Sequence, residues 1–244
     1  MRAMRRDATE AAPQERAQRS IPAEDFEHFV GLISHDVRNS TRALLMVPQW
    51  IREDLETAGV PLAGPLQENL DLLGTHTRRV DRMLSDLIVH ARVGLRQTQR
   101  IVRFDEAIDA ALKRIDLPDS IVPLRDLRHP SIRIGDEDIL TLIGALVDNA
   151  IRHRDAEATF VKIATCLENE FCLLTVEDDG PGIPERYRRR VFEAMTTLKP
   201  RDEVEGSGMG LATVRKIAAH YGGAAQISDR QGGRGTRLLI RLPT

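Results

Sequence analysis

Two glycine-rich segments in the C-terminal half constrain what this chain can fold into. Residues 178–184 read DDGPGIP, and residues 206–211 read GSGMGL and lead directly into an apolar helical pattern. Glycine lets backbone N–H groups approach an anion closely, and a helix N-terminus adds about half a positive charge there. Because both features favour anions, the pair predicts a site for the phosphate groups of a nucleotide rather than two ordinary turns.

The N-terminal half carries two amphipathic patterns. Residues 23–58 place apolar side chains at three- and four-residue steps, and Pro48 within them is expected to bend a helix without ending it. A turn rich in glycine and proline follows, and then a heptad seam that predicts an antiparallel helical hairpin. One hairpin cannot cover both of its seams, so we expect two copies to form a four-helix bundle as a homodimer, although a different partner chain would cover them equally well. The seam residues are Leu66, Leu70, Leu73, Thr77, Val80, Leu84, Leu87 and Ala91.

The seam dissolves near residues 94–100, where we place a domain boundary. The predicted organisation is an N-terminal tail (1–22), a helical domain (23–96) and an α/β sandwich with an antiparallel or mixed sheet (97–244). Helices are expected at residues 105–115, 138–154, 185–192 and 209–221. Strands are expected at residues 101–104, 131–134, 159–167, 171–177, 225–229 and 236–242.

Composition narrows the possible partners and location. The 244 residues contain 35 Lys and Arg against 37 Asp and Glu, which does not favour general nucleic-acid binding. The sequence shows neither a signal peptide nor an apolar run long enough to span a membrane, so we expect a cytoplasmic protein. Cys166 and Cys172 fit no metal or redox spacing. They fall on the two arms of a predicted hairpin, nearly opposite each other, and are expected to be reduced core residues.

One histidine does not fit the packing pattern of the first helix. His35 is two residues from both Ile33 and Val37, so it points roughly 200° away from the apolar stripe and toward solvent. A neutral imidazole can attack phosphorus if a neighbour orients or removes its other proton, and Asp36 is the candidate neighbour. Asn39 follows one turn later and could hold a water molecule for the reverse, hydrolytic reaction.

Four motifs now stand in a recognisable order. Residues 33–39 (ISHDVRN), 146–153 (LVDNAIRH) and 191–193 (VFE) resemble the phosphoacceptor box, the N box and the F box of two-component sensor histidine kinases. The two glycine-rich segments resemble the paired glycine boxes of that family. The resemblance extends from about residue 25 to the C-terminus. It implies an α+β protein, in which a dimerisation and phosphoacceptor hairpin precedes an ATP-binding domain of the GHKL type.

The resemblance also implies roles for individual residues. Asn149 is expected to bind Mg²⁺ through its amide oxygen, and Asp178 to accept a hydrogen bond from the adenine amino group. Asp179 is expected to be exposed. Gly180 and Gly182 would pass close to the base and ribose, and Gly206, Ser207, Gly208, Gly210 and Leu211 would surround the phosphates. His153 and, in a lid over residues 193–205, Lys199 and Arg201 are further candidates for phosphate contacts.

The implied reaction is transfer of the γ-phosphoryl group from Mg-ATP to His35, and then to an aspartate of a separate response regulator receiver domain. A separate sensor protein, the tail or the bundle itself would supply the stimulus. The chain departs from the family at two positions. Ser40 stands where the family commonly has proline, and Ala145 where many relatives carry a polar residue.

Three alternatives remain open. The first is a phosphotransfer relay whose nucleotide domain has decayed, although both glycine-rich segments are intact. The second is another ATPase or a protein-serine kinase of the same superfamily, but that class lacks a hairpin bearing a histidine. The third is a net phosphatase acting on a receiver, with Asn39 central and ATP as a regulator.

Overall fold

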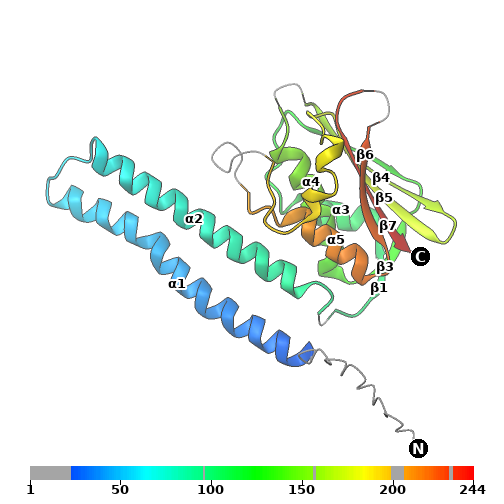
Figure 1. Ribbon diagram of the computed structural model, residues 1–244, viewed down its shortest axis with the longest axis horizontal. Helices are drawn as coiled ribbons and strands as arrows, with labels where there is room; N and C mark the ends of the chain where they lie inside the picture. Colours follow the sequence, from blue (N-terminus) through cyan, green and yellow to red (C-terminus); the bar gives the residue numbers. More distant parts are fainter. Residues whose placement is uncertain (1–22, 96, 156–157, 199–205, 231–232) are drawn as a thin grey trace, which may run out of the picture.

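The computed structural model describes residues 23–95, 97–155, 158–198, 206–230 and 233–244 (Figure 1). In the first helix it describes side chains from residue 39 onward. The proposed tail, residues 1–22, lies outside the described residues. In Figure 1 the long helical hairpin lies beside a second body made of strands and helices.

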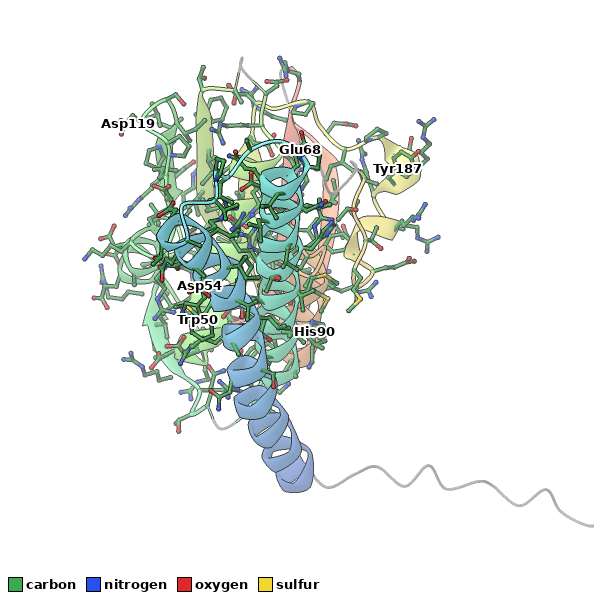
Figure 2. All side chains as sticks on the ribbon, turned by 90° about the vertical axis from the view of Figure 1, so that its left-hand side faces the viewer. Trp50, Asp54, Glu68, His90, Asp119 and Tyr187 are labelled. Atoms are coloured by element: carbon green, nitrogen blue, oxygen red, sulfur yellow. The ribbon has the colours of Figure 1, made fainter. Side chains whose placement is uncertain are left out.

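The hairpin consists of α1 (Ala23–Thr57) and α2 (Pro65–Arg92), which confirms the two predicted helices. Pro48 lies inside α1, and the helix continues through it. The guanidinium of Arg52 pairs with the carboxylate of Asp71 at 2.6 Å and joins the two antiparallel helices at this level. In Figure 2 the hairpin stands in front of the second body, with Glu68 near the upper end of α2 and His90 near its lower end.

The heptad seam of α2 divides into two columns. Leu70 and Thr77 are buried within the single chain. The other column is exposed at every turn of the seam. Its exposed fractions are 40% for Leu66, 45% for Leu73, 48% for Val80 and 43% for Leu87.

The second body is an α/β sandwich built on a mixed five-stranded sheet in the order β2-β4-β5-β7-β6. Only β2 runs parallel to its neighbour, β4; the other pairs are antiparallel. A separate antiparallel pair joins β1 and β3. The strands are β1 (Arg100–Arg103), β2 (Val122–Leu127), β3 (Ser131–Ile134), β4 (Phe160–Glu168), β5 (Phe171–Asp178), β6 (Ala224–Asp229) and β7 (Thr236–Pro243).

Three helices pack on the face of the sheet that looks toward the hairpin (Figure 1): α3 (Phe104–Leu112), α4 (Asp136–Arg152) and α5 (Gly210–His220). Alternate residues of β5 point into this layer, so Leu174 and Val176 are buried. Leu142 and Leu146 of α4 meet them in one continuous core. Burial of this apolar stripe orients α4, and it leaves the opposite side of the helix for polar residues.

The structure corrects several sequence-based expectations. Strand β2 was missed, and residues 185–192 form two short 3₁₀ turns, Glu185–Tyr187 and Arg190–Phe192, in place of one helix. That segment has too few apolar positions to form a buried stripe. Cys166 and Cys172 are not opposite each other, because Cys166 pairs with Leu173 and Cys172 with Leu167. Directly paired residues share a face of the sheet, so Cys166 lies on the face of Leu173. Cys172 is the neighbour of Leu173 in the strand and therefore lies on the opposite face. Cys172 is buried, and Cys166 is half-buried on the outer face.

None of the helices in the described part of the chain combines the length and the apolar composition that crossing a membrane requires.

A buried carboxylate fastens the link between the two bodies. Asp138, at the start of α4, is 3% exposed. It accepts hydrogen bonds from the backbone of Gly94 (3.1 Å), from the Gln97 amide (2.9 Å) and from the Tyr221 hydroxyl (2.7 Å). The same hydroxyl accepts from the backbone N–H of Gly135 at 3.0 Å. Burial and the bond to Asp138 raise the pKa of Tyr221 to about 12, so the hydroxyl keeps its proton.

Replacing Tyr221 with phenylalanine should therefore destabilise the fold. The change leaves an acceptor on Asp138 and the Gly135 N–H without their partner, which costs about 1–3 kcal/mol. Equilibrium urea unfolding measures the difference. A loss below about 0.5 kcal/mol, the range of an ordinary surface substitution, would contradict this role.

Candidate functional site

A cavity of about 1010 Å³ opens between the helical layer and the hairpin. Its walls come from α2, from the end of α3, from one side of α4 and from the start of α5. The loops after β5 and before α5 close the remaining sides. The cavity brings both glycine-rich segments and the N-box helix together, as the sequence predicted.

Helix α4 gives the cavity its polar wall. Leu146 and Ala150 are buried in the core, so their neighbour Asn149 is half-buried and turned toward the cavity. His153, at the C-terminal cap of α4, also lines it. Ala145, where many family members carry a polar residue, lies one turn before Asn149 in the same wall.

Asp178 ends β5 at the edge of the cavity and is 8% exposed. Its Oδ1 accepts hydrogen bonds from the backbone N–H groups of Gly180 (3.0 Å) and Thr236 (3.2 Å). Burial raises the pKa of the carboxyl group, and these hydrogen bonds oppose the rise. The two amides hold the carboxyl group in one orientation, with the cavity beside it, which is what recognition of a hydrogen-bond donor on a ligand requires.

Asp179 has a structural role, so the expectation that it is exposed was wrong. The side chain is half-buried and accepts hydrogen bonds from the backbone of Thr159 and Phe160 and from the Thr159 hydroxyl, at 2.8–3.3 Å. Burial acts to raise the pKa of Asp179, but the hydrogen bonds outweigh it and the net shift is downward. Asp179 thereby ties the end of β5 to the start of β4.

The second glycine-rich segment turns into α5 at Gly210. Ser207 is 4% exposed, and its Oγ accepts a hydrogen bond from the backbone N–H of Met209 at 3.1 Å. All residues from Gly206 to Leu211 line the cavity. The N-terminus of an eleven-residue helix therefore faces the space in which anionic groups of a ligand would lie.

Gly208 should not tolerate a side chain. Its φ is +74°, and an added Cβ would come within 2.6 Å of the carbonyl oxygen of Thr196. Because backbone atoms cannot move aside cheaply, Gly208→Ala should reshape the loop and weaken nucleotide binding at least tenfold, or about 1.4 kcal/mol. Gly206→Ala is the matched control, since nothing lies within 4 Å of its Cβ position. Calorimetric titration compares the two, and equal affinities would contradict the prediction.

The proposed phosphoacceptor residues lie on α1. The helix includes His35 and Asp36, whose side chains are outside the described part of the structure. Asn39 is exposed on the same helix, one turn after His35. Lys199 and Arg201 of the proposed lid also lie outside the described residues.

One part of the site was missed by the sequence analysis. Arg82, Asp86 and Val89 of α2 line the cavity. They follow one another at steps of four and three residues, on the side of α2 opposite the heptad seam. This second stripe in the sequence could have indicated that α2 contacts another element as well as α1.

Comparison with known proteins identifies the second body. Residues 135–244 match the family model described as "Histidine kinase-, DNA gyrase B-, and HSP90-like ATPase". This part of the chain is an ATP-binding domain of that family. With the relatives and solved structures that it resembles, the match shows the ATP-binding catalytic core of a sensor histidine kinase. The cavity between α4, α5 and the two glycine-rich segments lies in this domain and is its candidate ATP site.

Some of the similar proteins match more of this chain than the ATP-binding domain alone. The chain is 29% identical to the sensor protein CutS of Streptomyces coelicolor over 238 residues, 94% of this chain and 55% of CutS. The structure of the mycobacterial sensor histidine kinase MprB has a TM-score of 0.52 at 26% identity, covering 60% of this chain and 97% of that one. Full-length ShkA in complex with AMPPNP shares the fold at a TM-score of 0.64 and 18% identity, covering 88% of this chain and 45% of ShkA.

The chain spans only part of such relatives, from 25% to 55% of the length of the first two curated proteins that it matches. Within the described residues, no group of three or more His, Cys, Asp or Glu side chains is placed to hold a metal ion. The donor set of the ATP-binding domain instead fits Mg²⁺ carried by a nucleotide. Asn149 offers one hard oxygen at the cavity wall, and a triphosphate supplies others.

Proposed function

We propose that this protein is a histidine kinase that transfers the γ-phosphoryl group of ATP to His35 and then passes it to an aspartate of a separate response regulator. The observation that carries the proposal is the position of the ATP-site cavity against α2. His35 lies as many residues before Arg52 in α1 as Ile88 lies after Asp71 in α2. Because Arg52 and Asp71 form an ion pair and the helices are antiparallel, this count brings His35 level with Ile88. The cavity is lined by Asp86 and Val89 of α2, so by this count its opening would lie at the level of His35 along the hairpin.

The walls of the cavity suit the parts of ATP. Asp178, fixed by the amides of Gly180 and Thr236, would accept a hydrogen bond from the adenine amino group. The N–H groups of the second glycine-rich segment and the start of α5 would receive the phosphates. Asn149 and phosphate oxygens would hold Mg²⁺, which would neutralise charge on the phosphates. His153 also lines this cavity.

The transfer step needs little covalent help from the protein. A ring nitrogen of His35 forms a bond to the γ-phosphorus as the bond from that phosphorus to the bridging oxygen breaks, and ADP leaves. Asp36 would take or orient the proton of the other ring nitrogen, so that the imidazole acts as a nucleophile. Positioning and charge neutralisation therefore account for most of the rate enhancement.

We also propose that the working unit is a homodimer. The column formed by Leu66, Leu73, Val80 and Leu87 repeats every seven residues and is about 40–50% exposed. A heptad column that its own hairpin leaves uncovered is typical of a four-helix bundle completed by a second copy. The expected partners are a response regulator receiver domain and, for the stimulus, a separate sensor protein; the expected location is the cytoplasm.

The proposal is tested by incubating the chain with Mg-ATP labelled at the γ-phosphate. A histidine kinase should acquire label that is lost in acid and kept in base, and chelation of Mg²⁺ should prevent the labelling. Label that is stable in acid would indicate a serine kinase. Label acquired only from a phosphorylated receiver would indicate a phosphotransfer relay. Loss of phosphate from a receiver without self-labelling would indicate a phosphatase, for which the exposed Asn39 is the candidate.

A further inference from the structure

The carboxyl group of Asp178 is held by backbone groups from two separate segments. Its Oδ1 accepts a hydrogen bond at 3.0 Å from the N–H of Gly180, which belongs to the first glycine-rich segment. It accepts another at 3.2 Å from the N–H of Thr236, at the start of β7. The carboxyl group keeps one orientation only while these two N–H groups keep their positions relative to each other. Contacts that join the two segments therefore bear on Asp178.

Arg234 joins the first glycine-rich segment to the start of β7. It lies two residues before Thr236, and its Nε donates a hydrogen bond to the carbonyl oxygen of Gly180 at 3.2 Å. Gly180 thus donates to Asp178 through its N–H and accepts from Arg234 through its carbonyl group. One side chain thereby connects the residues that carry the two donors.

Asp155 holds the guanidinium group of Arg234 from the other side. Its carboxylate pairs with Nη2 of the arginine, and it lies three residues after the end of α4. The two side chains are 39% and 38% exposed, so the ion pair by itself contributes little to stability. Its effect is on orientation. A guanidinium group is a planar fork, so pairing Nη2 with Asp155 helps to fix the direction in which Nε points.

The backbones of the two segments are in direct contact beside this arginine. Gly235 has φ of +125°, and an added Cβ would lie 1.9 Å from the carbonyl oxygen of Asp178. An added Cβ on Gly182 would lie 3.1 Å from the carbonyl oxygen of Gly235. The two segments therefore pack without room for side chains between them, and Arg234 spans their junction.

We propose that Arg234 is a positioning residue for adenine recognition. By holding the carbonyl of Gly180, with Asp155 as its partner, it fixes the two N–H groups that orient Asp178. Within the described residues, neither Arg234 nor Asp155 lines the cavity, so both act on the nucleotide through Asp178. The inference rests on the proposed function only in that Asp178 accepts a hydrogen bond from the adenine amino group.

The test measures nucleotide affinity of the full chain by calorimetry. Arg234→Met keeps a long side chain but removes every donor, so ATP and adenosine should both bind about tenfold more weakly, the order of one hydrogen bond to a charged group. GTP affinity should not change, because guanine presents a carbonyl oxygen where adenine has its amino group. Asp155→Asn, which removes only the charged partner, should weaken ATP binding about threefold.

The matched control is Arg128→Met. Arg128 is an exposed arginine that pairs with Asp126 at 3.2 Å, directly after β2 and away from the cavity lining. Its replacement likewise breaks an ion pair between an arginine and an aspartate, and it should leave ATP affinity at the wild-type level.

An Asp178→Asn background separates positioning from general support of the fold. There Arg234→Met should change ATP affinity less than about threefold, since the pairing with adenine is already lost. If Arg234→Met did not fold, the same comparison would use Asp155→Asn, whose loss should disappear in that background. An equal loss in both backgrounds, or unchanged ATP affinity in the wild-type background, would overturn the inference while leaving the ATP site intact. A wild-type chain that bound no ATP would reject the proposed function as well.

Discussion

Replacing His35 with glutamine should abolish the incorporation of labelled γ-phosphate, while ATP binding stays at the wild-type level. Glutamine approximates the size of histidine and can remain helical, but its amide nitrogen is not a nucleophile. The loss should be complete, because the proposed reaction uses the imidazole of His35 as its acceptor. Autoradiography measures the label, and calorimetry measures ATP affinity.

The matched control is His76→Gln, which changes an exposed histidine on α2 of the same hairpin. It should leave labelling unchanged. A His35→Gln variant that still acquired acid-labile label would contradict the assignment of the phosphoacceptor. A variant that lost ATP binding as well would show that the substitution had damaged the ATP site, and then the loss of label would say nothing for His35.

Replacing Asp178 with asparagine should weaken ATP binding by about 100-fold, or roughly 2.7 kcal/mol. The amide oxygen of asparagine can still accept from Gly180 and Thr236. The amide nitrogen of asparagine, a donor, then stands in place of the second carboxylate oxygen of Asp178, an acceptor. Since the adenine amino group is also a donor, two donors would face each other. A site that hydrogen-bonds a ligand group binds the ligand much more weakly when one member of that pair is lost.

The change should affect adenine nucleotides specifically. GTP, which presents a carbonyl oxygen in place of the adenine amino group, should lose no affinity. Asp119→Asn, an exposed carboxylate labelled in Figure 2, serves as the control for loss of one negative charge. Equal weakening of ATP and GTP binding would mean that Asp178 supports the loop and does not recognise the base.

Local patterns in the sequence predicted the elements that have a periodic apolar pattern or begin in a glycine-rich motif. The heptad of α2, the apolar stripe of α4 and the glycine-rich approach to α5 each depend on neighbours within a few residues, so periodicity and glycine placement identify them. Strand β2 was missed for a physical reason. It is a sheet edge whose first four residues are exposed and include Pro123, so it lacks the alternation that marks a strand.

The contacts between the hairpin and the ATP-binding domain could not be predicted in the same way. The hydrogen bonds from the Lys216 ammonium group on α5 to the carbonyl oxygens of His90 and Ala91 on α2 join residues more than a hundred positions apart, and no local pattern predicts such a pairing. The stripe of Arg82, Asp86 and Val89 shows that α2 has a second face, but not what that face meets. The structural role of Asp179 likewise depends on Thr159, which only the folded sheet brings near.

The most direct measurement is the site of phosphorylation itself. The wild-type chain is incubated with Mg-ATP, digested at neutral pH or above, and mapped by mass spectrometry under conditions that preserve phosphoramidates. A single phosphate on the imidazole of His35 would agree with a kinase whose nucleotide is held between α4 and α5 and delivered to α1. A phosphate on any other residue, or none while ATP is demonstrably bound, would contradict that account.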